Sequence, residues 1–142
     1  MGKVIGTAAV LLALALGAAA QPDGGTLAGL WLTEDGDGVI QLAPCGAAMC
    51  GRIVGFEGGV SPRDWQGRPE CGLQISRVTE RQPGRWRGTI TDPRNGTVYD
   101  VLMSADGAHL RLRGFVIVPL LGQTQLWTRY TGQLTPDCRM QH

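Results

Sequence analysis

Four cysteines are the residues of this chain best suited to covalent or metal chemistry: Cys45, Cys50, Cys71 and Cys138. In an exported protein, an even number of cysteines indicates disulfides, and four cysteines allow three pairings. We favour Cys45–Cys50, because these residues flank a short turn between predicted strands, together with Cys71–Cys138. Zinc is the alternative, but the C-x4-C spacing is loose and no C-x-x-C or paired-histidine motif accompanies it. We therefore predict two disulfides and no metal site.

Acid–base and nucleophilic chemistry has few candidate residues. The sequence has two histidines, His109 and His142. We expect His109 on a solvent-facing strand position beside Asp106, with nothing to set it against a nucleophile. Neither a Gly-x-Ser-x-Gly elbow nor a phosphate-binding loop is present in the sequence. These observations predict no catalytic residue and no cofactor.

Carboxylates leave one route to catalysis open. Asp64 lies in a long polar loop, and Asp92 and Asp100 flank a Pro-Arg-Asn-Gly turn. Paired carboxylates about 5–10 Å apart in a cleft can hydrolyse glycosides. The residues around Asp92 favour a structural role, because Asp-Pro and Asn95-Gly96 are turn-forming pairs. An enzyme is therefore the least favoured of the functions considered.

Residues 114–122 form a stretch that is apolar on both faces, Gly-Phe-Val-Ile-Val-Pro-Leu-Leu-Gly. We favour a strand end buried on both sides, followed by a hairpin corner, because small barrels fill their own interiors with side chains. The other interpretation is the apolar rim of a ligand cavity. In that case the apolar contacts would come from Phe115, Ile117, Leu120 and Leu121, with Arg113 and Tyr99 as polar anchors.

The first 20 residues have the pattern of a secretory signal peptide. Lys3 precedes an apolar run, and small residues with an Ala18-x-Ala20 site close it, so cleavage is expected after Ala20. An uncleaved anchor is the alternative, but a run of about 13 residues is short for a bilayer. We predict a domain over residues 21–142, located in the periplasm or secreted, without a membrane span after cleavage.

The charge of the chain excludes one class of partner. Its 13 basic and 12 acidic residues nearly balance, and the arginines are spread from Arg52 to Arg139. A nucleic-acid binder needs a clustered basic footprint. We therefore predict no nucleic-acid partner.

The elements that would position these residues are strands, because short apolar runs alternate with Gly, Pro, Asp and Asn turns. The clearest alternation is in residues 109–113, where leucines face one way and His and Arg the other. About eight strands at this spacing predict an all-β protein with a single antiparallel up-and-down β-barrel. The expected strands are Leu27–Glu34, Val39–Pro44, Gly51–Phe56, Gly72–Thr79, Arg85–Thr91, Thr97–Ser104, His109–Val118 and Gln123–Thr131.

Several segments taken together resemble a family of small exported bacterial proteins that is known only as a domain of unknown function. The pieces are Gly29-Leu30-Trp31, Cys50-Gly51-Arg52-Ile53-Val54, Asp64, Trp86-Arg87-Gly88, and residues 92–99, 110–115 and 121–129. The resemblance implies export and a lipocalin-like barrel, without an established activity. The loop after Asp64 departs from the family, because residues 65–70 read Trp-Gln-Gly-Arg-Pro-Glu where many relatives carry an Asn-Pro-Asp-like segment.

A looser resemblance to lipocalin-like barrels implies structural roles for three residues. Such barrels carry Gly-x-Trp on the first strand and an Arg near the end of the last, which lies across the Trp and closes the barrel. Gly29, Trp31 and Arg129 occupy those places here. Asp92, Asn95 and Gly96 are expected to build a turn.

Three functions compete on this basis. The first is an exported protein of the bacterial envelope that binds a small apolar or amphipathic ligand in the mouth of the barrel. The second is a structural or protein-interaction module with a filled barrel, and the third is an enzyme of unknown type. The sequence leaves the oligomeric state open.

Overall fold

The computed structural model describes residues 2, 6, 9, 26–58 and 61–141. Apart from three isolated positions, the predicted signal peptide and its cleavage site lie outside the described residues, as does His142. The domain boundary at residue 21 therefore remains a prediction. Among the helices of the described chain, none is long and apolar enough to cross a membrane.

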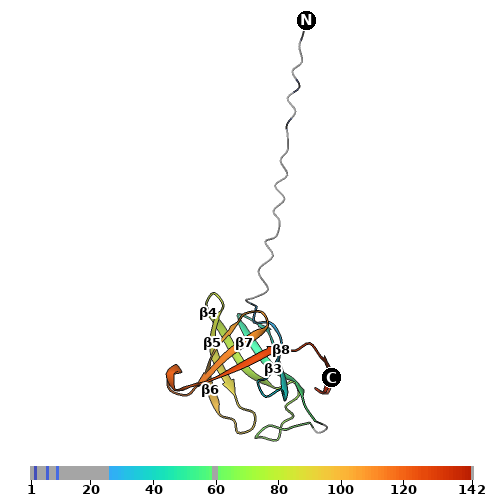
Figure 1. Cartoon of the computed structure of the whole chain (residues 1–142), viewed down its shortest axis with the longest axis vertical. Helices are drawn as coiled ribbons and strands as arrows, with labels where there is room; N and C mark the ends of the chain where they lie inside the picture. The colour runs from blue at the N-terminus through green and yellow to red at the C-terminus, as the bar shows by residue number, and fades with distance from the viewer. Residues whose placement is uncertain (1, 3–5, 7–8, 10–25, 59–60, 142) are drawn as a thin grey trace.

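Eight antiparallel strands form a closed barrel in which each strand pairs with the next along the chain and β8 returns to β1 (Figure 1). The pairing of Trp31 with Arg129 closes the ring. The predicted all-β, up-and-down barrel is thus confirmed. The strands are β1 (Gly29–Leu32), β2 (Gly38–Cys45), β3 (Ala48–Phe56), β4 (Gln74–Gln82), β5 (Arg85–Thr91), β6 (Val98–Ala105), β7 (His109–Phe115) and β8 (Gln123–Arg129).

Two parts of the chain differ from the prediction. Strand β7 ends at Phe115, not at Val118, because a short 3-10 helix, η2 (Pro119–Leu121), turns the chain back toward β8. The favoured interpretation of residues 114–122 as a doubly buried strand end is therefore wrong. The structure also adds a small C-terminal hairpin of β9 (Gln133–Leu134) and β10 (Met140–Gln141), which the sequence did not predict.

The barrel interior is occupied by a cluster of buried side chains. On β7, Leu110 and Leu112 are buried, whereas His109 and Arg111 are exposed, so the predicted alternation is present. On the other strands, too, every second side chain points into the barrel interior. The cluster includes Trp31, Ile40, Leu42, Met49, Ile53, Val78, Val101, Met103, Leu110, Leu112 and Trp127.

One end of the barrel is closed by Arg129. Its guanidinium carbon lies 3.8 Å from the centroid of the Trp31 ring. The side chain also donates to the backbone carbonyls of Gly107 (2.7 Å), Ala28 (2.7 Å) and Thr26 (2.9 Å). A Cβ at Gly29, where φ is +135°, would lie 2.3 Å from Arg129 Nη1, so this position needs glycine. The Gly–Trp–Arg contact implied by the resemblance is present.

Two disulfides hold the connections in place, and they join the two pairs favoured from the sequence. Cys45–Cys50 spans the β2–β3 turn. Cys71–Cys138 links the β3–β4 connection to the C-terminal tail, 67 residues further along the chain. The tail packs against β3, because Phe56 N–H donates to the carbonyl of Cys138.

Candidate functional site

The most unusual surface of the domain is the β7–β8 connection, residues 116–121, which we call the apolar loop. Its exposed large side chains are Val116, Ile117, Val118, Leu120 and Leu121. Their exposed fractions run from 43% for Val118 to 85% for Leu120. Figure 1 shows the loop as the orange coil projecting from the side of the barrel. Contiguous exposed apolar surface of this kind marks interaction sites.

Arg113 holds the apolar loop in a defined shape. Its Nε donates to the carbonyl of Pro119 at 2.6 Å and its Nη2 to the carbonyl of Leu120 at 3.2 Å. Its Nη1 donates to Thr124 Oγ1 at 2.7 Å, which ties the loop to the start of β8. Two backbone hydrogen bonds, from Leu121 N–H to the carbonyl of Val118 and from Gly122 N–H to that of Pro119, complete the turn. The loop is thus a preformed projection.

The six residues predicted for ligand binding do not form one site. Ile117, Leu120 and Leu121 are exposed, and Arg113 contacts the loop backbone. Phe115 is buried, with Arg87 over its ring at 5.6 Å. Tyr99 pairs with Ile90 and shares the inward-facing parity of Val101 and Met103, whereas Arg113 lies on the outer face. The predicted polar anchors therefore lie on opposite faces of the sheet.

Arg87 is a functional candidate that the sequence did not reveal. It pairs with Leu102, and Leu102 pairs with Arg113, so the two arginines lie in one row across β5, β6 and β7. This row borders the base of the apolar loop, because Arg87 lies over the ring of Phe115, the residue that directly precedes the loop. The sequence alone could not place Arg87 beside the loop, because its position there depends on the register of β5, β6 and β7.

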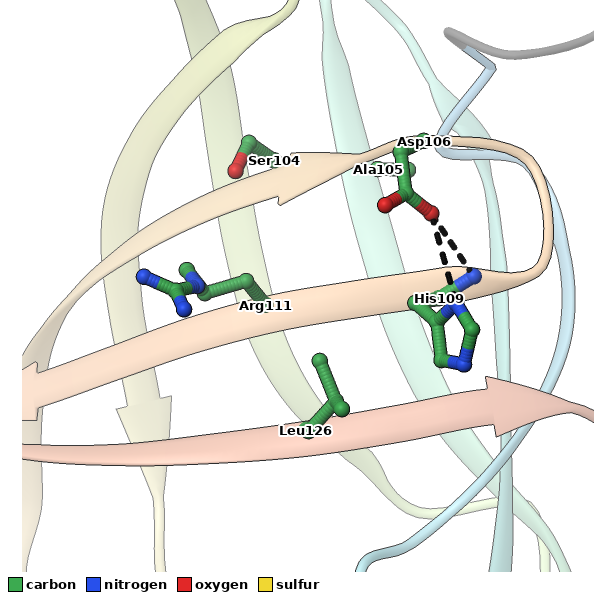
Figure 2. A pocket seen from close by; sticks show the side chains of 6 residues that line it. All are labelled: Ser104, Ala105, Asp106, His109, Arg111 and Leu126. Carbon is green, nitrogen blue, oxygen red and sulfur yellow. Dashed lines mark hydrogen bonds and ion pairs between the residues drawn. The ribbon is translucent and has the colours of Figure 1, made fainter.

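Two hollows lie on the outside of the barrel. One, of about 290 Å³, is lined by Ser104, Ala105, Asp106, His109, Arg111 and Leu126 (Figure 2). The other, of about 270 Å³, is lined by Arg81, Gln82, Arg85, Trp86, Arg87 and Leu102. The second hollow includes Arg87 and Leu102, and its Trp86 packs against the buried cluster of the barrel interior.

The hollow in Figure 2 holds a serine, a histidine and an aspartate, but not in a catalytic arrangement. Asp106 accepts a hydrogen bond from the His109 backbone N–H at 3.0 Å, and its carboxylate lies 3.6 Å from His109 Nδ1. Ser104 points away from His109 in Figure 2 and has no hydrogen bond to it. Both members of the pair are solvent-exposed. The predicted solvent-facing position of His109 beside Asp106 is therefore observed.

Asp64 organises the long β3–β4 connection. It accepts hydrogen bonds from the backbone N–H groups of Gln66 and Arg68 and from Arg68 Nε at 2.7 Å. Burial by itself would raise the pKa of Asp64, but these hydrogen bonds and the Arg68 charge outweigh it, so its pKa lies below the ordinary value. Trp65 N–H donates to the carbonyl of Pro93, which docks this connection on the β5–β6 turn.

The β5–β6 turn is built as the sequence predicted. Asp92 accepts hydrogen bonds from the Arg94 backbone at 2.9 Å and from the Arg94 guanidinium, and these lower the pKa of Asp92. Asn95 Oδ1 accepts from Thr97 N–H, and Gly96 has a φ of +76°. The pKa of Glu70 is raised by partial burial and by the nearby charges of Asp64 and Asp92. The carboxylates of Asp64 and Asp92 are thus engaged in loop and turn structure.

Two buried polar atoms in the barrel have no hydrogen-bond partner among the described residues, Ser76 Oγ and Trp86 Nε1. Ser76 faces Gly51 across β3 and β4, and a Cβ at Gly51 would lie 2.2 Å from Ser76 Oγ. Within the described part of the chain, no group of three or more His, Cys, Asp or Glu side chains is arranged to hold a metal ion.

Comparison with known proteins gives a family and little more. The family described as an uncharacterised protein conserved in bacteria, DUF2147, matches residues 29–129, which is more than half of the chain. No curated protein matches the chain, and no solved structure does. The match begins at Gly29 of β1 and ends at Arg129 of β8, so it covers the whole barrel.

Proposed function

We propose that this chain, which belongs to the bacterial family DUF2147, is an exported, non-enzymatic binding protein of the bacterial envelope. Its binding surface is the apolar loop, which engages an apolar or amphipathic partner. The two disulfides are compatible with export, because disulfides persist in oxidising compartments.

The exposure of the apolar loop carries this proposal. Leu120 is 85% exposed and Ile117 78%, whereas the large apolar residues of the barrel interior are buried. Fully burying a leucine or isoleucine side chain stabilises by about 1.5–3 kcal/mol, so leaving both in water forgoes that stabilisation. The three hydrogen bonds from Arg113 keep the loop extended outward when it could otherwise collapse onto the barrel. This arrangement favours a surface held ready for a partner.

The apolar loop has the shape of a surface that a partner packs over, and not of a pocket that encloses a ligand. Small-molecule sites are concave and bury most of the ligand. The apolar loop instead projects from the barrel (Figure 1). An apolar chain, a protein or an ordered amphiphile that packs over the projection fits this geometry better than a small ligand held in the mouth.

Titration with a non-ionic detergent, dodecyl maltoside, tests the proposal. We expect amide chemical shifts of residues 116–121 to move in the wild-type protein and to stay in place in Leu120→Asn. Leu126→Asn is the matched control, because Leu126 is also an exposed leucine but lies on β8 in the hollow of Figure 2. Shifts that are absent from the loop, or identical in Leu120→Asn and the wild type, would refute the proposal.

Binding of a small ligand inside the barrel is a second candidate, supported by the unpartnered Ser76 Oγ and Trp86 Nε1. A buried polar atom without a partner is costly, so a bound polar group would relieve that cost. Native mass spectrometry of the oxidised protein would show a reproducible added mass that is lost on denaturation. A bare mass with both disulfides intact would count against this candidate.

A further inference from the structure

We propose that the partner of the apolar loop is the surface of a phospholipid bilayer with anionic headgroups. This inference rests on the proposed function and names the chemistry of its partner. The apolar loop would enter the boundary between headgroups and acyl chains, while arginines at its base contact lipid phosphates. The protein would thereby be held on the membrane surface by one loop.

The composition of the loop suits insertion into lipid. Residues 114–122 contain no charged side chain, and the exposed large residues of the loop are all aliphatic. Hot spots of protein interfaces are enriched in Trp, Tyr and Arg, and stable interfaces use about 20–30 residues a side. A six-residue aliphatic projection is small for such an interface, but it matches the requirement of shallow membrane insertion.

Hydrogen bonds satisfy part of the backbone of the apolar loop. In hydrocarbon, an unsatisfied backbone carbonyl or N–H costs several kcal/mol. Here Arg113 donates to the carbonyls of Pro119 and Leu120, and the carbonyl of Val118 accepts from Leu121 N–H. Pro119 has no N–H to satisfy. These bonds satisfy the carbonyls of Val118, Pro119 and Leu120 at the tip of the loop.

Arginines without acidic partners lie on the outer face of the barrel, and two of them are at the base of the loop. Arg87 and Arg113 share one row on the outer face, and Arg111 follows on β7 toward the other end of the barrel. None of the three forms an ion pair with a carboxylate within the described ranges. Asp100 lies in the neighbouring row, in register with Thr89 and Phe115, and among the described residues it forms no ion pair with these arginines.

This charge arrangement selects an orientation and a lipid type. Arginines near an anionic surface each add to membrane affinity, whereas carboxylates reduce it. The β1–β2 turn carries Glu34, Asp35 and Asp37 and lies at the same end of the barrel as the apolar loop, with Glu34 accepting a hydrogen bond from Leu126 N–H of β8. It lies across the ring from β5 and β6, so a bilayer against the outer face of β5–β7 would leave these carboxylates in water. The outer face of β5–β7 should face toward the bilayer, with the aliphatic tip below the level of the phosphates and the guanidinium groups at that level.

Vesicle flotation of the purified, oxidised protein tests the inference. The probes are vesicles of equal parts phosphatidylglycerol and phosphatidylethanolamine, compared with phosphatidylcholine vesicles. We expect binding to the anionic vesicles that weakens with salt, and a loss of affinity of about tenfold or more in Leu120→Asn. Leu126→Asn should bind as the wild type does. Absence of binding by the wild type, or equal binding by Leu120→Asn, would overturn the inference.

A second pair of variants tests the role of charge separately. Arg87→Gln should lower affinity for the anionic vesicles about fivefold and leave any binding to phosphatidylcholine unchanged. Arg81→Gln is the matched control and should have a smaller effect, because Arg81 lies beside the β4–β5 turn, at the end of the barrel away from the apolar loop. If detergent shifts the loop resonances but the vesicles do not bind, the membrane inference is wrong while the proposed function stands. If detergent does not shift them either, both are wrong.

Discussion

Replacement of Arg129 by methionine should be among the most destabilising single changes on this barrel. The side chain makes three hydrogen bonds to carbonyls, at 2.7, 2.7 and 2.9 Å, and lies 3.8 Å from the Trp31 ring centroid. Hydrogen bonds to charged groups contribute about 1.5–3 kcal/mol each, and a cation–π contact about 0.5–2 kcal/mol. Their plain sum overstates the loss, because one rigid group makes all four contacts and Arg129 is itself desolvated, which lowers its pKa.

We therefore expect Arg129→Met to reduce the free energy of unfolding by about 3–5 kcal/mol. Arg129→Lys keeps the charge but not the fork that reaches three carbonyls, so about half of that loss should remain. Trp31→Ala removes the ring from the core and should cost about 3–5 kcal/mol. Each change removes a large part of the 5–15 kcal/mol that a domain of this size typically has.

Urea unfolding at pH 7, with both disulfides intact, measures these differences. With a denaturant dependence of about 2 kcal/mol/M, a loss of 4 kcal/mol moves the midpoint by about 2 M. Arg111→Met is the matched control, because Arg111 is exposed on β7 and should change stability by less than about 0.5 kcal/mol. If Arg129→Met unfolds within about 1 kcal/mol of the wild type, Arg129 does not close the barrel as argued.

Two further predictions concern the connections between the strands. The double variant Cys71→Ala/Cys138→Ala should lower the free energy of unfolding by about 4 kcal/mol, and Cys45→Ala/Cys50→Ala by about 2 kcal/mol, because the first bridge closes a longer loop. Equal losses in urea unfolding would contradict this reasoning. The pKa of Asp64 is depressed in the folded state, so its stabilisation is present above the ordinary value of 3.8 and is lost as the pH falls below it. Asp64→Asn should therefore be less stable than the wild type at pH 7, with a difference that shrinks through that range, and a difference constant from pH 7 to pH 2.5 would show that the carboxylate charge is not responsible.

The barrel could be predicted because its signals are local. Alternation on β7, turn-forming pairs such as Asn95-Gly96 and the even spacing of the strands each indicate the same architecture. The disulfide pairing also depended on a local feature, the short turn between Cys45 and Cys50, which left the long-range pair as the remaining choice.

The candidate surface could not be predicted in the same way. Residues 114–122 are apolar on both faces, and such a run is normally buried, so the sequence favoured a strand end. Its exposure depends on Arg113, which bonds the carbonyls of Pro119 and Leu120 and fixes the loop away from the barrel. The position of Arg87 beside the loop depends on register across three strands, which periodicity does not encode.

Photo-crosslinking in cells tests the central claim, that the apolar loop is the binding surface, most directly. A benzophenone side chain placed at Leu120 should form an adduct in bacteria that produce the protein, because the loop is covered by its partner there. The same probe at Leu126, on the outer face of β8, should react far less. A lipid adduct at Leu120 is the result that the account predicts. No adduct at Leu120, or equal reaction at the two positions, would contradict it.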